Sequence, residues 1–143
     1  MPSGHADWTI RPEYYDRAPL PQLLNFSAFA LGPHAATVRA SYTVPSGKRA
    51  YIELARSFIR RNTAATAVSE VRGTINLNST DALTNTLVHT EFLDNATTAR
   101  HDQVVGVSGL LVAADVVRIL TQDAGTGGTC SYYLTAKAVE FTV

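Results

Sequence analysis

The chain contains one cysteine, no proline after Pro45 and no excess of either charge. The single thiol of Cys130 excludes an internal disulfide, and a cysteine within β-strand sequence is more often a small buried hydrophobe than a nucleophile. The 12 basic and 12 acidic side chains cancel. This balance argues against a nucleic-acid binder, which usually carries a basic face, and against a protein held to membranes by charge.

Long apolar runs are also missing. No segment approaches the roughly 18 consecutive apolar residues of a membrane-spanning helix. The N-terminal sequence MPSGHADWTIRPEYYD has no apolar core segment, so we expect no secretory signal there. We therefore predict that the protein has no membrane partner.

Proline is confined to one part of the chain. All six prolines lie at or before Pro45. Because proline fixes the backbone φ angle and removes a hydrogen-bond donor, it is scarce inside β-sheets. The sequence therefore predicts an extended N-terminal arm over residues 1–24 and a β-sandwich domain over residues 25–143.

The body of the chain has the composition and periodicity of β-strands. Thr, Val and Ile account for 35 of the 143 residues, and β-branched side chains favour pleated surfaces. Seven or eight alternating segments are separated by Gly, Asn, Asp and Ser, a pattern typical of sandwiches and barrels. The segments 49–60 and 130–143 are long enough for the central hairpins of a jelly roll. We therefore predict an all-β fold, a single antiparallel jelly-roll-like sandwich of about eight strands.

The alternation also assigns side chains to faces, because successive residues of a strand point to opposite sides of the sheet. Four groups are each predicted to share a face: Val38, Ala40, Tyr42 and Val44; Ile52, Leu54 and Phe58, opposite Ala55 and Ser57; Val71, Ile75 and Leu77; and Val117 with Ile119. In the last strand, Tyr132 and Leu134 are predicted to oppose Tyr133. The segment 80–92 leaves a short helix open as an alternative, because Thr80 or Asp81 could cap it.

The stretch TVPSGKR, residues 43–49, contains the Gly-Lys pair of many phosphate-binding loops. A Walker loop also needs an upstream glycine, a Ser or Thr after the lysine, and a following helix. Here Arg49 follows the lysine and a strand comes next, whereas Pro45 and Gly47 suit a tight turn. We therefore predict a hairpin turn, whose Lys48 and Arg49 could pair with carboxylates of a neighbouring subunit. The Gly-rich segment 123–130 is likewise predicted to be a hairpin tip.

Residues with catalytic or metal-binding chemistry are scattered. None of the four histidines has a second histidine at the spacing of a zinc-ligand pair. His89 and Glu91 could share one face of a strand. This placement has two interpretations, a cupin-like metal site or a simple ion pair. No GxSxG nucleophile elbow is present, and the carboxylates occur singly. We therefore predict no catalytic residues, no metal, no cofactor and no enzymatic activity.

The arm carries the residue types that dominate protein interfaces. Trp, Tyr and Arg recur in binding hot spots, and proline-spaced aromatics dock as extended segments that lose little entropy. The predicted partner-binding residues are Trp8, Ile10, Tyr14, Tyr15, Arg17, Leu20, Leu23 and Leu24. The alternative is that the arm folds back onto its own sandwich.

The arm, followed by the segments TVPSGKRAYIEL, ADVVRILTQDAG and SYYLTAKAVEFTV, resembles the capsid decoration (cement) proteins of tailed bacteriophages, which have a jelly-roll body. The resemblance covers residues 35–143. It rests on the sequences of the hairpin segments and on the order of the strands. It implies a structural virion protein, a homotrimer on the outer surface of an icosahedral head. Its arm would contact the major capsid protein and bridge capsid subunits.

Two other functions stay open. A receptor- or carbohydrate-binding jelly-roll module of a phage tail or fibre would need an exposed aromatic platform. The loop 123–130 has no aromatic residue before Tyr132. A cupin-like metalloenzyme would need further ligands near His89 and Glu91.

Overall fold

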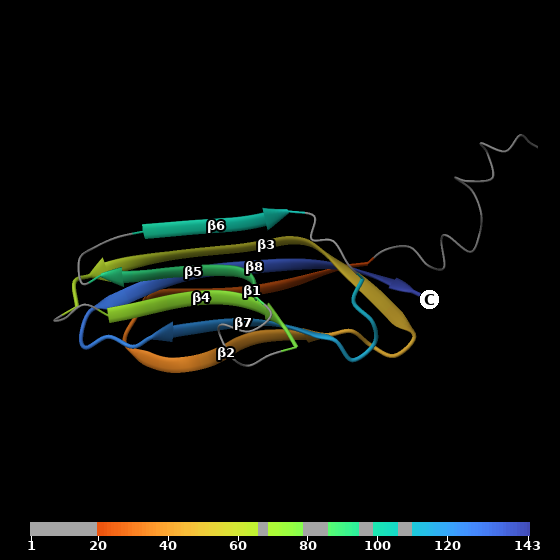
Figure 1. The fold of residues 1–143 in the computed structure, drawn as a ribbon, viewed down its shortest axis with the longest axis horizontal. Helices are drawn as coiled ribbons and strands as arrows, with labels where there is room; N and C mark the ends of the chain where they lie inside the picture. Colours follow the sequence, from red (N-terminus) through yellow and green to blue (C-terminus); the bar gives the residue numbers. More distant parts are fainter. Residues whose placement is uncertain (1–19, 66–68, 79–85, 95–98, 106–109) are drawn as a thin grey trace, which may run out of the picture.

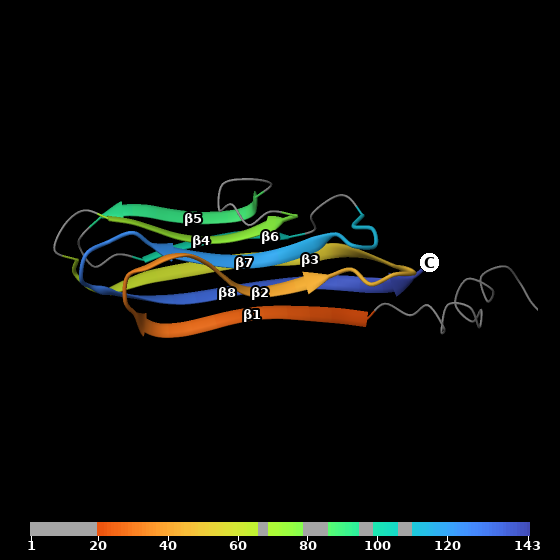
Figure 2. The ribbon, with the colours of Figure 1, turned by 90° about the horizontal axis from the view of Figure 1, so that it is seen from below.

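The computed structural model describes residues 20–65, 69–78, 86–94, 99–105 and 110–143. They form eight strands: β1 (Leu20–Leu31), β2 (His34–Thr43), β3 (Lys48–Thr63), β4 (Ser69–Leu77), β5 (Thr86–Asp94), β6 (Ala99–Val105), β7 (Val116–Asp123) and β8 (Thr129–Thr142). These strands form two four-stranded antiparallel sheets, β1-β8-β3-β6 and β2-β7-β4-β5. Figures 1 and 2 show the strands running along the long axis of the domain.

The pairing of the strands is nested. β1 pairs with β8, β2 with β7, β3 with β6, and β4 with β5, all antiparallel. The chain is therefore one long hairpin wound around itself, and the β3–β8 and β4–β7 ladders join neighbouring pairs into sheets. This winding is that of a jelly roll. The prediction of an all-β jelly-roll-like sandwich is confirmed.

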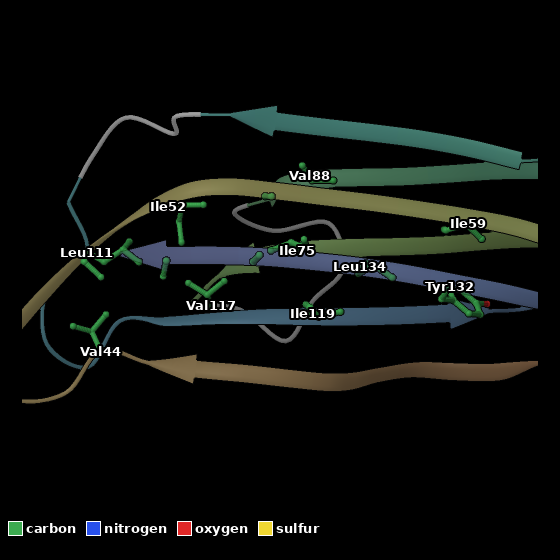
Figure 3. Close-up of a cluster of buried hydrophobic side chains, with 14 of the residues drawn as sticks. Val44, Ile52, Ile59, Ile75, Val88, Leu111, Val117, Ile119, Tyr132 and Leu134 are labelled. Carbon is green, nitrogen blue, oxygen red and sulfur yellow. The ribbon is translucent and has the colours of Figure 1, made fainter. Parts of the chain in front are cut away.

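The core lies between the two sheets, where the inward faces of the strands meet. Ile52 and Ile59 of one sheet and Ile75 and Ile119 of the other are at most 2% exposed (Figure 3). The predicted alignments of Val71 with Ile75 and of Val117 with Ile119 are confirmed, since all four side chains are buried. In β8, Tyr132 and Leu134 face the core and Tyr133 is exposed, so the predicted opposition of these side chains is confirmed.

Two predicted faces are wrong because the strands contain irregularities. In β3 the register shifts between Ile52 and Leu54. One extra residue reverses the direction of every later side chain in the strand. Ala55 and Ser57 are therefore buried beside Ile52, and Phe58 turns to the outer face.

The second irregularity lies in β2, between Val38 and Ala40. It leaves Val38 42% exposed, whereas Tyr42 packs against the core as predicted. Arg39 takes the place of Val38 on the inner side. Its Nε donates to Thr121 Oγ1 at 2.9 Å, and its guanidinium lies 5.0 Å from the centre of the Phe26 ring.

The tight turn in TVPSGKR is confirmed. The amide of Lys48 donates to the carbonyl of Pro45 at 3.2 Å, and Gly47 has a φ of 75°. The strands on either side, β2 and β3, belong to different sheets, so the predicted hairpin is wrong. Each strand pairs with a partner from the second half of the chain, and the turn crosses between the layers. The C-terminus lies beside this turn, where Val143 donates to the carbonyl of Gly47 (Figure 1).

The Gly-rich segment also joins strands of different sheets, β7 and β8. The predicted hairpin tip is therefore wrong for the same reason. Gly128 has a φ of 76°, and a Cβ at this position would lie 2.8 Å from the carbonyl oxygen of Thr63. The loop thus packs closely against the end of β3.

The N-terminal boundary differs from the predicted one. β1 begins at Leu20, and residues 20–24 pair with residues 136–140 of β8. The part of the predicted arm from Leu20 to Leu24 is therefore a strand of the sandwich. Trp8, Ile10, Tyr14, Tyr15 and Arg17 lie outside the described residues.

The segment predicted as a possible short helix overlaps β5. Residues 86–92 form a strand that pairs with β4, and residues 80–85 lie outside the described part of the chain. Within the described residues, no helix has the length and hydropathy needed to cross a membrane.

Candidate functional site

The outer face of the β1-β8-β3-β6 sheet carries a row of aromatic rings. Tyr133, Phe58 and His101 lie opposite one another on β8, β3 and β6. The ring centres of Phe58 and Tyr133 are 5.9 Å apart, and those of Phe58 and His101 are 6.5 Å apart. Tyr133 is 46% exposed, and His101 is also exposed. We call these three residues the aromatic row.

The irregularity in β3 creates this row. Without it Phe58 would point to the core together with Ile52, as the alternation alone predicts. The shift is visible in the burial of the folded strand and not in the sequence alone. Ile52 and Ile59 are both buried although they are an odd number of positions apart. Two side chains at an odd spacing share a face only where a strand contains an extra residue.

A second row lies one step along the strands. It consists of Asn25, Thr135, Arg56 and Gln103, which are register partners across β1, β8, β3 and β6. We call it the polar row. Thr135 Oγ1 donates to Asn25 Oδ1 at 2.9 Å. Within the described residues, the side chains of Arg56 and Gln103 are exposed and make no hydrogen bond or ion pair.

A third row is more apolar. Leu23, Lys137, Leu54 and Val105 are register partners across the same four strands. Leu23 is 62% exposed and Val105 is 66% exposed. Lys137 forms an ion pair of 3.0 Å with Glu53, the residue at the β3 irregularity. The charge of Lys137 is therefore balanced within the face, whereas Arg56 forms no ion pair with another described residue.

Strand β1 forms one edge of this sheet, and its outer edge has no partner strand among the described residues. Leu20 is 53% exposed, and Phe29 is 79% exposed. An exposed edge with apolar side chains is a template for pairing with another chain. Of the predicted arm residues, Leu20 and Leu23 are exposed at this edge, and Leu24 packs against the core.

His89 and Glu91 form an ion-pair network on the other sheet. Their closest contact, between Nε2 and Oε2, is 2.8 Å, and Nδ1 of His89 lies 3.1 Å from Thr74 Oγ1. Arg72 contacts both Glu91 and Glu70. The described residues hold no group of three or more His, Cys, Asp or Glu side chains arranged for a metal ion. The arrangement supports the ion-pair interpretation of this motif.

Cys130 lies in the core at the end of the sandwich that carries the Gly-rich loop. Burial raises the pKa of its thiol to about 11, and its Sγ donates to Asp123 Oδ2 at 3.7 Å. Asp123 also accepts a hydrogen bond from the amide of Gly125 and so holds the start of the loop. A buried thiol with a raised pKa is not a nucleophile at neutral pH.

Lys48 finds its partners within its own chain. Its Nζ donates to Thr142 Oγ1 at 2.8 Å and lies 3.8 Å from Glu140 Oε1. The carboxylate of a neighbouring subunit is therefore not needed to balance this charge. Arg49, the next residue, is exposed at the same turn.

No protein-family model matches the sequence, and no curated protein matches it. Among solved structures, dimeric latent PorU from Porphyromonas gingivalis matches 89% of this chain with a TM-score of 0.50 and 9% identity. The arabinose-bound MgGH51 α-L-arabinofuranosidase has a TM-score of 0.39, 14% identity and 88% coverage. A structure of infectious bursal disease virus, Gt strain, has a TM-score of 0.34, 12% identity and 87% coverage.

The chain spans 13%, 23% and 33% of the length of these three chains. At such low identity, the likeness to PorU concerns the fold alone. Function is therefore inferred from this chain's own side chains.

Proposed function

We propose that this chain is a structural, non-enzymatic virion protein that binds the outer surface of an icosahedral phage capsid and bridges its subunits. The observation that carries the proposal is the edge strand β1, which exposes Leu20, Leu23 and Phe29 beside an edge that no described strand pairs with. The proline-bearing residues 1–19 lead directly into this strand. The jelly-roll winding and the resemblance to decoration proteins support the same function.

The proposed partners are the major capsid protein and further copies of this chain, as a homotrimer, with no nucleic acid and no membrane. A strand of a partner can add to the free edge of β1 through main-chain hydrogen bonds. Burying apolar surface stabilises such a contact by ~25 cal/mol per Å². Repeated over many copies on a capsid, small contributions of this kind strengthen the whole shell.

The proposal is tested by locating the chain in virions and by deleting the arm. Immuno-electron microscopy with an antibody against this chain should label the outer surface of phage heads. A variant lacking residues 1–19 should keep its fold, because the deletion ends before β1, and should lose capsid binding in co-sedimentation. A deletion of residues 1–24 is less suitable, because it removes β1 residues that pair with β8.

A second test variant is Phe29→Ser in the full-length chain, which keeps the arm and changes the exposed edge. Capsid binding should fall in this variant too, and circular dichroism should show an unchanged β-sheet spectrum. Absence of the chain from purified virions would rule out the proposal. Full capsid binding by both variants would rule out the arm and the edge as the contact.

A second candidate function is that of a receptor- or carbohydrate-binding module. The aromatic row favours it, because Tyr133 and His101 are exposed on either side of the half-buried Phe58. Neighbouring rings in the row are tilted by 47° and 49°. The row lies on the sheet and not in the loop 123–130.

A further inference from the structure

We propose that the aromatic row and the polar row together bind an acidic saccharide, with a sugar ring on Tyr133 and Phe58 and its carboxylate on Arg56. This inference rests on the second candidate function, carbohydrate recognition, and names the class of ligand.

The aromatic row supplies the stacking surface. Sugar rings present C–H groups on their faces, and aromatic rings have electron-rich faces that attract such groups. Tyr133 and Phe58 lie on adjacent strands with ring centres 5.9 Å apart, and Tyr133 is 46% exposed. The row continues to His101 on the edge strand β6, so it crosses three neighbouring strands. A row of this length offers room for more than one sugar ring.

The polar row supplies the charge. Arg56 is two residues before Phe58 on β3, so the two side chains emerge on the same face about 6.7 Å apart. A guanidinium binds a carboxylate with two parallel hydrogen bonds, a geometry that an ammonium group does not provide. Gln103 lies next to Arg56 on β6, and its side-chain amide is also exposed. Both groups are available to a ligand.

The charges on this face favour an anion. Glu53 is the acidic side chain nearest to the rows along β3, and Lys137 pairs with it at 3.0 Å. Arg56, and Arg60 two residues beyond Phe58, make no ion pair within the described part of the chain. Among the described residues, the face therefore carries positive charge that no acidic side chain pairs with. A neutral sugar has no negative group that could pair with these arginine side chains.

A nucleic acid is the less suitable anion. Its binding depends on many Lys and Arg contacts to successive phosphates. The chain has 12 basic and 12 acidic residues, and the rows contribute one arginine, Arg56, that pairs with no described residue. One carboxylate, stacked through its sugar ring, needs only one arginine, whereas nucleic-acid binding depends on several such contacts.

The experiment uses the full-length chain and oligogalacturonate as the probe. Binding is measured by calorimetry and by ligand-observed NMR, beside the fully methyl-esterified oligosaccharide, which keeps the rings and lacks the charge. We expect Arg56→Gln to weaken oligogalacturonate binding about tenfold or more and to remove the preference for the acid form. Tyr133→Ala should weaken binding to both forms. Arg49→Gln and Tyr51→Ala, exposed on the same strand outside the rows, are the matched controls and should bind normally.

The outcomes separate the inference from the function on which it rests. Equal binding of the acid and its ester, with no effect of Arg56→Gln, would overturn the acidic class and leave carbohydrate recognition standing. A sialylated or uronate-containing ligand from a glycan array with the same Arg56 dependence would support the inference. No binding to any acidic or neutral glycan would overturn both. Binding at the rows of an oligo-dT strand, or of a peptide of residues 1–19, in place of saccharides would also overturn the inference.

Discussion

The hydroxyl of Tyr42 donates to Oε2 of Glu140 at 2.7 Å, and this hydrogen bond joins the two sheets. Tyr42 belongs to β2 and Glu140 to β8, which lie in different layers. Glu140 is 6% exposed, and Lys48 lies 3.8 Å from its other oxygen. Burial, and then the hydrogen bond to Glu140, raise the pKa of Tyr42. The contact anchors the end of the sandwich where the chain turns from β2 to β3.

Removing this hydroxyl should destabilise the fold. In Tyr42→Phe, one oxygen of a buried carboxylate loses its donor, and an unsatisfied buried polar group costs about 1–3 kcal/mol. Urea unfolding should show this loss in the free energy of unfolding. Tyr51→Phe is the control, because Tyr51 is 38% exposed and its hydroxyl has no partner among the described residues. Equal stability of the two variants would contradict the role of the contact.

The sheets approach closely at Gly73, so a methyl group there should not fit. A Cβ at Gly73 would lie 2.8 Å from Ser57 Oγ and 2.9 Å from Ile59 Cδ1, both in the opposite sheet. Overpacking of this kind typically costs about 1–3 kcal/mol, and Gly73→Ala should lower the thermal midpoint accordingly. Gly32→Ala is the matched control, since nothing lies within 4 Å of its Cβ position. A similar midpoint for both variants would show that the sheets separate easily at this point.

Asp115 should make stability depend on pH in the acid range. Its carboxylate accepts hydrogen bonds from the amide of Val112 at 2.8 Å and from Asn78 Nδ2 at 2.9 Å. Both hydrogen bonds lower the pKa of Asp115, and the bond from the amide of Val112 has the larger effect. The contribution is thus present above the unfolded value of about 3.9 and is lost as the pH falls through the lower folded value.

The test compares Asp115→Asn with the wild type by thermal unfolding between neutral pH and about pH 2. The variant should be less stable at neutral pH, and the difference should shrink at the acid end. A difference that stays constant with pH would show that the charge of Asp115 contributes nothing.

Cys130 should react with thiol reagents only after unfolding. Its side chain is 0% exposed, and burial raises the pKa of its thiol to about 11. An aromatic disulfide reagent at neutral pH should therefore modify the native protein far more slowly than the urea-unfolded protein. Rapid, complete modification of the native protein, with circular dichroism unchanged, would show that this end of the sandwich opens readily.

Much of the fold can be predicted from local patterns. In β4, β7 and β8, alternation correctly groups the side chains that face the core. Within each of these strands, the grouped residues stand at every second position without a break. Pro45 and Gly47 predict a tight turn because their φ preferences favour one. This preference does not depend on which strands the flanking segments pair with. Cys130 is predicted to be buried from its strand context alone.

The candidate site was not predicted from the sequence. Alternation places Phe58 on the same face as Ile52, and the aromatic row exists only because β3 shifts its register between Ile52 and Leu54. The same kind of shift moved Val38 outward and brought Arg39 over Phe26. An irregularity of this kind is a property of two paired strands, and the partner of β3 lies in the last segment of the chain. No count along one strand reveals it.

The sequence by itself determined the class of the protein: the strand segments, the breaks between them, the tight turn and most of the side chains of the core. Local backbone preferences and burial of apolar surface act on residues close in the chain, so a single strand already expresses them. The tertiary structure decided which strands pair, where the turns cross between sheets and which side chains reach the outer face. These outcomes depend on contacts between residues such as Phe58 and Tyr133, far apart in sequence, and only the assembled sandwich brings them together.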